Sequence, residues 1–115
     1  MTVQEKEKSL NDLILKWALK IADEIKELGR EAPKTIRTGD LSDALQEAHQ
    51  VLILAEEDDL AEEVRNLRVE IESIRGEIID RGRYYYRLVK VEPTKKNIIR
   101  LAEKIKERIR SKANQ

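Results

Sequence analysis

The sequence predicts an all-α fold, a four- to five-helix bundle with a central heptad-seamed helix and a basic C-terminal helix. Apolar residues recur every three or four positions, as they do on one face of an α-helix. Only four glycines and two prolines interrupt the 115 residues. Hydrophobic residues make up 40% of the chain, enough for a folded core although another 40% is charged. We expect residues 1–115 to form a single domain, with a place in a longer polypeptide left open.

The first helix is predicted over about residues 3–28. Its apolar stripe comprises Leu10, Ile14, Trp17, Ile21, Ile25 and Leu28. Gly29 follows the stripe, where a left-handed residue commonly ends a helix. Trp17 lies within the stripe and is expected in the core. Phe is absent and aromatic residues are only 3% of the chain, so the rest of that core is expected to be aliphatic.

The second and third helices are predicted as an antiparallel hairpin. Residues 29–39 form a loop with Pro33 and Gly39 as breakers, after which Asp40 can cap the second helix. Its apolar residues are Leu41, Ala44, Leu45, Ala48, Val51, Leu52 and Ala55, with Ile53 and Leu54 widening the stripe. A third helix starts near Asp59, with the apolar residues Leu60, Val64, Leu67, Ile71, Ile74 and Ile78 at heptad spacing. We prefer the hairpin because a single 40-residue helix would span roughly 60 Å.

The final third of the chain is predicted to be helical and basic. Gly82 interrupts the seam, and residues 84–91 are assigned to a helix, with a short extended segment as the alternative. Pro93 marks a break before the last helix. The apolar face of that helix comprises Ile98, Leu101, Ala102, Ile105 and Ile109.

The residue inventory argues against catalysis and resident cofactors. The chain has no cysteine and one histidine, His49, which is read as a helical residue at or near the surface. Gln46 precedes it by three positions, so the Glu-x-x-His pair of di-iron bundles is absent. There is no phosphate-binding glycine loop, and the acids at 56–59 are read as caps and solvated charge. We therefore expect no catalytic residue, no metal and no cofactor, with nucleotide binding as a minor alternative.

No apolar run reaches the 18–20 residues that a bilayer crossing needs, and no signal peptide opens the chain. We expect no membrane partner and a cytoplasmic location. The abundance of Glu, Lys and Arg is thermophile-like.

The charge is balanced overall but divided along the chain. Residues 1–80 hold 11 basic and 20 acidic residues, whereas residues 81–115 hold 12 basic and 3 acidic ones. A split of this size predicts either a polyanion-binding end or two opposite surfaces that meet. In the second case the basic helix would lie against the acidic second and third helices.

The Arg/Tyr-rich start of the basic region predicts a nucleic-acid site. Arginine can grip phosphate through two hydrogen bonds, and tyrosine rings can stack on unpaired bases. The predicted nucleic-acid-binding residues are Arg81, Arg83, Tyr84, Tyr86, Arg87, Lys90, Lys95, Lys96 and Arg100. Tyr85 continues the heptad spacing, so core and surface positions are both open for it. A second candidate phosphate contact precedes the second helix and comprises Lys34, Thr35, Arg37 and Thr38.

The predicted function is non-catalytic binding of nucleic acid, with single-stranded or template DNA favoured, as in an accessory module of a replication enzyme. The first alternative is a protein-interaction or self-assembly module that uses the seam from Leu60 to Ile78. The second is a small nucleotide-binding domain that uses residues 34–39 or the basic segment. The expected partners are nucleic acid and, in the first alternative, a partner protein or the parent polypeptide.

Overall fold

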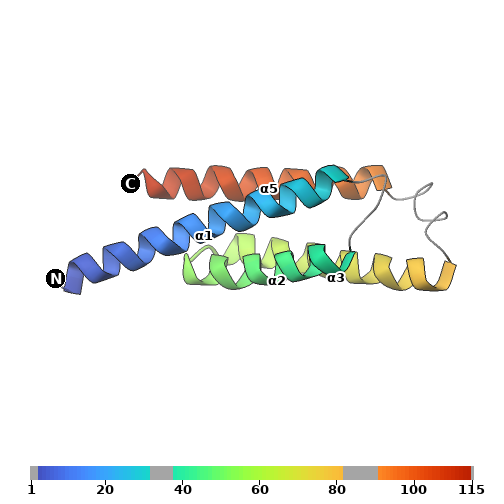
Figure 1. Ribbon diagram of the computed structural model, residues 1–115, viewed down its shortest axis with the longest axis horizontal. Helices are drawn as coiled ribbons and strands as arrows, with labels where there is room; N and C mark the ends of the chain where they lie inside the picture. Colours follow the sequence, from blue (N-terminus) through green and yellow to red (C-terminus); the bar gives the residue numbers. More distant parts are fainter. Residues whose placement is uncertain (1–2, 32–37, 82–90, 115) are drawn as a thin grey trace.

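The described part of the chain forms four antiparallel helices. The computed structural model describes residues 3–31, 38–81 and 91–114, and side chains at residues 10–30, 39–74 and 94–114. The helices are α1 (Val3–Glu31), α2 (Thr38–Leu54), α3 (Asp58–Arg81) and α5 (Val91–Ala113). They run alternately up and down along one long axis (Figure 1). The bundle is elongated, with extents of 57 × 20 × 20 Å.

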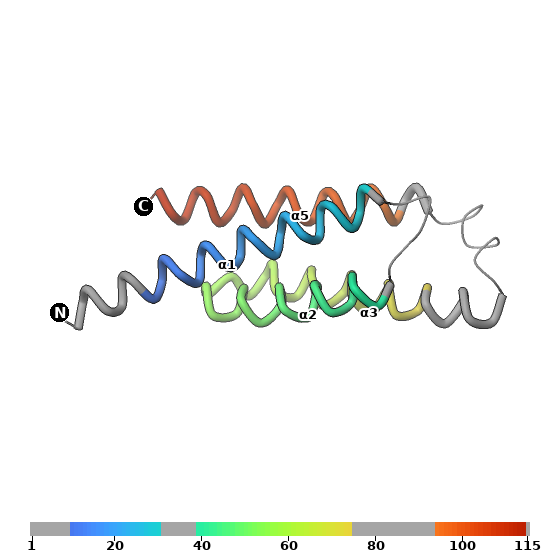
Figure 2. Tube along the Cα trace, viewed as in Figure 1, coloured from blue at the N-terminus to red at the C-terminus, as the bar shows by residue number. Residues whose placement is uncertain are grey.

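Packing is strongest within two pairs of helices. α2 packs along α3, and α1 packs along α5. α1 also contacts α2, whereas the backbones of α3 and α5 approach each other less closely. Figure 2 shows the α2–α3 hairpin as one side-by-side pair. The predicted helical bundle is therefore confirmed in its coarse form. Residues 84–90, on which a fifth helix depended, lie outside the described residues.

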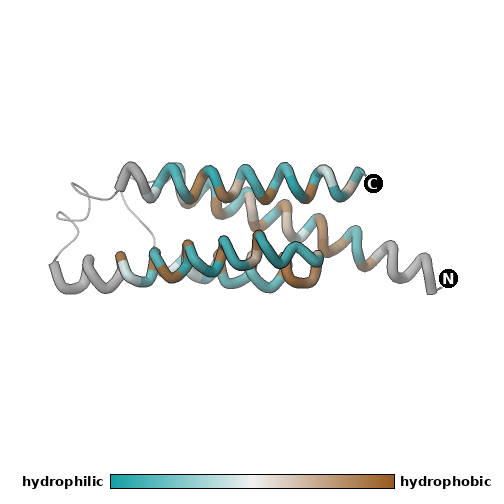
Figure 3. Tube along the Cα trace, turned by 180° about the vertical axis from the view of Figure 1, so that it is seen from behind, coloured by the Kyte–Doolittle hydropathy of each residue, from teal (hydrophilic) through white to brown (hydrophobic). Residues whose placement is uncertain are grey.

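The core is aliphatic, and polar and apolar residues alternate along each helix (Figure 3). The predicted faces of α2 and α5 are buried. On α3 the buried residues include Leu60, Val64, Leu67, Ile71 and Ile74, each at most 6% exposed. Ile53 and Leu54 were expected to widen the α2 stripe, but they are 49% and 55% exposed. They point away from the neighbouring helices near the last turn of α2.

The turn between α2 and α3 confirms the predicted hairpin. Glu56 has φ 60°, the left-handed conformation that usually selects glycine. Its amide donates to Ile53 O at 3.0 Å, and the next amide, of Glu57, donates to Leu52 O at 2.8 Å. These two bonds satisfy carbonyls left open at the end of α2, so the chain reverses there without a glycine or proline.

The end of α1 differs from the prediction. The helix continues to Glu31, and Gly29 lies buried inside it instead of ending it. A Cβ built on Gly29 would lie 2.8 Å from Ile98 Cγ2 and 3.2 Å from Ile99 Cγ1 of α5. Gly29 therefore allows α1 and α5 to pack closely. From local sequence alone, a glycine with this role looks the same as a glycine that ends a helix.

The predicted stripe in the first half of α1 is buried only in part. Leu10 is 59% exposed and Trp17, expected in the core, is 36% exposed, whereas Ile14 packs against the core. Leu13, which is outside that stripe, is 61% exposed. The cause is length, because α1 has 29 residues while α2 has 17. α1 extends past the α2–α3 turn, so α2 does not cover its N-terminal end (Figure 1). Trp17 still lies beside α2, where its Nε1 donates to Glu47.

The starts of α2 and α5 lie earlier than expected. α2 begins at Thr38, which places Asp40 in the first turn. A carboxylate is stabilised there by the positive end of the helix dipole. α5 begins at Val91, so Pro93 stands inside the first turn instead of before the helix. Proline is tolerated there because the first-turn amides have no partner within the helix.

Polar side chains join α2 to α3 beside the core. Ser42, only 3% exposed, donates from Oγ to Glu72 Oε1 at 2.6 Å, and Arg68 Nε donates to Ser42 Oγ at 3.2 Å. His49 is half-buried, with Nδ1 2.9 Å from the carbonyl oxygen of Ala61. A carbonyl can only accept, so Nδ1 carries the proton in this contact.

Candidate nucleic-acid interface

Because the helices run antiparallel, four helix ends lie toward one end of the bundle, among them the end of α1 at Glu31. α2 begins there at Thr38, α3 ends there at Arg81, and α5 begins there at Val91 (Figure 1). We call this the Thr38/Val91 end. The opposite end holds the α2–α3 turn and both chain termini, and we call it the turn end.

The predicted nucleic-acid residues fall into a described and an undescribed group. Lys95 is half-buried, while Lys96 and Arg100 are exposed, all within the first turns of α5. Arg81 and Thr38 stand at helix ends, without described side chains. The remaining predicted residues lie outside the described part: Lys34, Thr35, Arg37, Arg83, Tyr84, Tyr86, Arg87 and Lys90.

Both undescribed segments are tethered to the Thr38/Val91 end by the chain itself. Residues 32–37 join Glu31 to Thr38, and residues 82–90 join Arg81 to Val91. All four flanking residues stand at this end of the bundle (Figure 1). Two candidate phosphate contacts far apart in sequence are thus anchored at the same end.

The N-termini of α2 and α5 also lie at this end. The first turn of a helix exposes backbone N–H groups and carries a partial positive charge, which favours an anion. Asp40 opposes this effect at α2. The N-terminus of α5 is followed by Lys95 and Lys96, which add to it.

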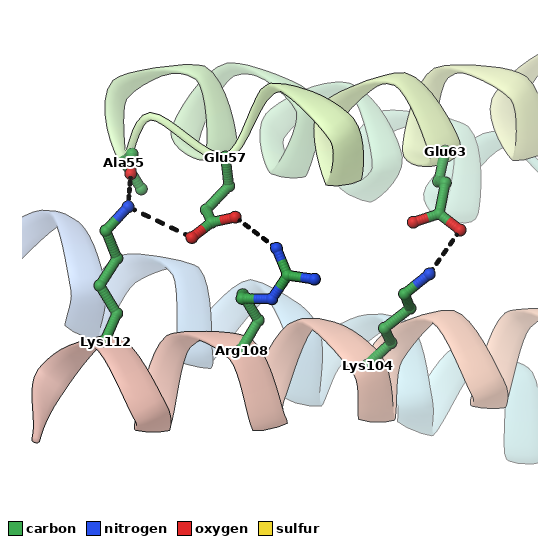
Figure 4. Close-up of polar contacts among 6 residues, drawn as sticks. All are labelled: Ala55, Glu57, Glu63, Lys104, Arg108 and Lys112. Carbon is green, nitrogen blue, oxygen red and sulfur yellow. Dashed lines mark hydrogen bonds and ion pairs between the residues drawn. The ribbon is translucent and has the colours of Figure 1, made fainter.

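Four cations in the second half of α5, Lys104, Lys106, Arg108 and Lys112, pair with carboxylates of the bundle. Lys104 Nζ lies 2.8 Å from Glu63, and Lys106 Nζ lies 2.7 Å from Asp23. Arg108 Nη1 lies 2.8 Å from Glu57 (Figure 4). The expected contact of the basic helix with acidic neighbours is therefore present in this half, and it includes α1. Surface pairs of this kind stabilise by only about 0–1 kcal/mol each.

Glu57 is the centre of the tightest charge cluster. Its side chain is 12% exposed and lies between Arg108 and Lys112, with Lys112 Nζ at 3.2 Å (Figure 4). Lys112 also donates to the carbonyl oxygen of Ala55, tying the end of α5 to the turn. Burial raises the pKa of Glu57, but hydrogen bonds from the two cations outweigh it and leave the pKa below 4.5. A hydrogen bond from Lys26 similarly lowers the pKa of Glu103.

We expect Glu57→Gln to lower the free energy of unfolding at pH 7 by about 1–2 kcal/mol, because charged hydrogen bonds are lost. The native pKa of Glu57 is lowered, so its stabilisation is present above pH 4.5 and is lost as the pH falls through the native value. Urea unfolding from pH 7 to pH 2.5 should show wild type and variant converging at acid pH. Glu62→Gln is the matched control, since Glu62 is 59% exposed and 3.8 Å from Arg65. An equal loss in both variants would contradict the assignment.

Arg100 stands apart from these pairs in a shallow groove between α3 and α5. The groove has a volume of about 300 Å³ and a floor that includes Leu67 and Leu101. Glu63 and Glu70 line it as well, so the charge of Arg100 faces carboxylates on the neighbouring helix. Among the described members of the predicted site, Lys96 is exposed and lies outside this groove.

Within residues 3–31, 38–81 and 91–114, no cluster of three or more metal-ligating side chains has the arrangement to hold a metal ion. In the same part of the chain, no helix combines the length and the apolar character that a bilayer crossing needs.

Comparisons with protein-family models, with curated proteins and with solved structures found no match to this chain.

Proposed function

We propose that the chain is a non-catalytic module that binds nucleic acid, with single-stranded DNA favoured, at the Thr38/Val91 end. The observation that carries the proposal is that two cationic segments, predicted separately from sequence, are anchored at the same end of the bundle. The N-termini of α2 and α5 open onto that end as well. Phosphate contacts from such a surface position a strand without reading its sequence.

The distribution of ion pairs supports this end over the other. Lys104, Lys106 and Arg108 lie toward the turn end and each contacts a carboxylate. Among the described residues, Lys95, Lys96 and Arg100 form no ion pair within 4.0 Å. Their charge remains available to phosphate, although Arg100 shares its groove with two carboxylates.

The test is fluorescence anisotropy with labelled single-stranded DNA, duplex DNA and single-stranded RNA over a range of salt concentrations. The variant Lys95→Gln/Lys96→Gln/Arg100→Gln should bind single-stranded DNA more weakly. The slope of log K against log salt should fall by about 2, because roughly 0.7 counterions are released per phosphate contact.

The matched control is Lys16→Gln/Arg65→Gln/Arg110→Gln, which removes three exposed cations from the turn half of the bundle. It carries the same change in net charge and should keep the wild-type slope. A common loss in both variants would indicate non-specific charge attraction. Absence of wild-type binding at low salt would remove the proposal.

A second arm of the same experiment separates stacking from charge. Tyr84→Ala/Tyr86→Ala should weaken single-strand binding while leaving duplex binding nearly unchanged, since stacking contributes about 1–3 kcal/mol per base. Equal losses on both ligands would assign the tyrosines to the fold. Titration with ATP, with and without magnesium, tests the nucleotide-binding alternative in the same assay.

The self-assembly alternative has less support. Its seam residues on α3, from Leu60 to Ile74, are at most 6% exposed and lie in the chain's own core. They could meet a partner helix only after the bundle opened.

A further inference from the structure

The surface formed by α1 and α2 has an acidic part and an apolar part. The acidic part is a groove with a volume of about 390 Å³. The five carboxylates that line it are Glu24, Glu27, Asp40, Asp43 and Glu47. Leu28 and Ala44 lie between them. Part of this charge is already engaged, since Glu27 accepts from Arg30 at 3.1 Å and Asp40 also interacts within the chain.

The second half of the same face is apolar and exposed. Its members are Leu10, Leu13 and Trp17 of α1 and Leu54 of α2, between 36% and 61% exposed. The two halves are joined by one contact, in which Trp17 Nε1 donates to Glu47 Oε1 at 2.8 Å. An exposed apolar patch at the edge of a groove is typical of an interaction site.

Heptad spacing makes the two halves one surface. Residues seven apart lie on the same side of a helix. Leu10, Trp17 and Glu24 follow each other at this spacing on α1, and Asp40, Glu47 and Leu54 do so on α2. The two helices run antiparallel, so both series change from apolar to acidic in the same direction (Figure 1). The surface from Leu10 to Glu27 is about 25 Å long at 1.5 Å per residue.

We propose that this face, the α1–α2 groove, docks a basic amphipathic helix of a partner protein. The partner would place leucine-like side chains over Leu10, Leu13, Trp17 and Leu54, and lysine or arginine side chains over the five carboxylates. Charge complementarity sets the sign of the partner, and the exposed apolar half requires that it also be amphipathic. Lys20, exposed on the same stripe of α1, lies where the two halves meet.

A second copy of this chain fits the groove less well. Its exposed basic helix is α5, and in the described residues the exposed large apolar side chains belong to α1, α2 and α3. Docking of α5 would therefore meet the acidic half and leave the apolar half uncovered. Nucleic acid is disfavoured because its phosphates would face the carboxylates.

The test uses synthetic 18-residue helical peptides that lack tryptophan. One half of each peptide carries leucines at heptad spacing and the other half carries lysines and arginines, with the two halves in either order. A scrambled peptide of the same composition is the reference. Trp17 is the only tryptophan of the chain, so its emission reports directly on the groove. A patterned peptide should shift this emission to shorter wavelength and bind at least about tenfold tighter than the scrambled one.

Two variants test the acidic half and the apolar half of the groove separately. Glu24→Gln/Glu27→Gln/Asp43→Asn should weaken binding about tenfold at low salt, and the difference should shrink in high salt because charge attraction is screened. Leu10→Gln/Leu13→Gln should weaken binding about tenfold at every salt concentration, since the apolar contact is not screened. The matched controls are Glu62→Gln/Glu70→Gln/Glu107→Gln for charge and Val69→Gln for exposed apolar surface.

Three results would overturn the proposal. The patterned peptides could bind no better than the scrambled one, or both groove variants could bind like wild type. Sedimentation could instead show that the wild-type chain is a dimer and that Leu10→Gln/Leu13→Gln makes it monomeric. That result would assign the face to a second copy of the chain. None of these outcomes bears on DNA binding at the Thr38/Val91 end, so the two proposals fail independently.

Discussion

Replacing Gly29 with leucine is expected to destabilise the bundle by about 3 kcal/mol, the upper part of the usual range for overpacking. Gly29 is buried, and a Cβ there would already lie 2.8 Å from Ile98 Cγ2. Ile98 is fully buried, so its methyl group has no free space to move into. Thermal unfolding should show the loss as a fall in Tm of roughly 10 °C.

Alanine at Gly29 and at Gly39 provides the matched comparison. Alanine gains about 0.5–1 kcal/mol over glycine inside a helix. At Gly39 a Cβ would meet nothing within 4 Å, so Gly39→Ala should stabilise. Gly29→Ala should instead lose about 1 kcal/mol net, because steric crowding outweighs the helix preference. The same substitution is thus expected to have opposite signs at the two positions.

The assigned contact can be tested with the partner side chain. Ile98→Ala removes the methyl group that a new Cβ would meet. In that background Gly29→Ala should be neutral or stabilising, which a double-mutant cycle would measure as a coupling. If the cost of Gly29→Ala is the same with Ile98 and with alanine, crowding against α5 is not its cause.

Replacing Ile71 with alanine is expected to cost about 2–5 kcal/mol, the range for truncating a fully buried isoleucine. Ile71 is 0% exposed in the middle of α3. Urea unfolding should show a lower midpoint with an unchanged m-value. The loss has two parts, the transfer of the side chain from water and the cavity that remains.

Val69 is the control on the same helix, because it is 63% exposed. Val69→Ala should change stability by no more than about 0.5 kcal/mol. Similar losses at both positions would contradict the orientation of α3. The unfolding midpoint should also be independent of protein concentration, since a seam buried by a second copy would make it rise with concentration.

The two proposed surfaces adjoin each other, because Asp40 in the first turn of α2 lines the acidic half of the α1–α2 groove. The DNA-binding proposal uses the Thr38/Val91 end, where Lys96 is exposed, and the helix-docking proposal uses the α1–α2 groove near Trp17. A chain with both surfaces could hold a partner protein beside a nucleic-acid strand. Their opposite charges would keep each ligand from the other's site.

The hairpin and the apolar faces of α2 and α5 could be predicted from periodicity alone. A residue such as Ile105 recurs with its neighbours every three or four positions, and that spacing determines which face of a helix is apolar. Charge asymmetry also gave contact of the basic helix with the acidic second and third helices as one of two alternatives, although not that Asp23 of α1 would be one partner. These features depend on local spacing or on composition, so they can be recognised in the sequence without knowing which helices pack together.

The tertiary structure decided which helices pack together and over what length of each helix. The stripe through Leu10, Trp17 and Ile25 is uniform in sequence, yet only its second half is buried, because the neighbouring helix α2 is shorter. Gly29 resembles a helix stop until Ile98 is brought against it. The α1–α2 groove arises only when acids from two helices come side by side, since no segment contains it by itself.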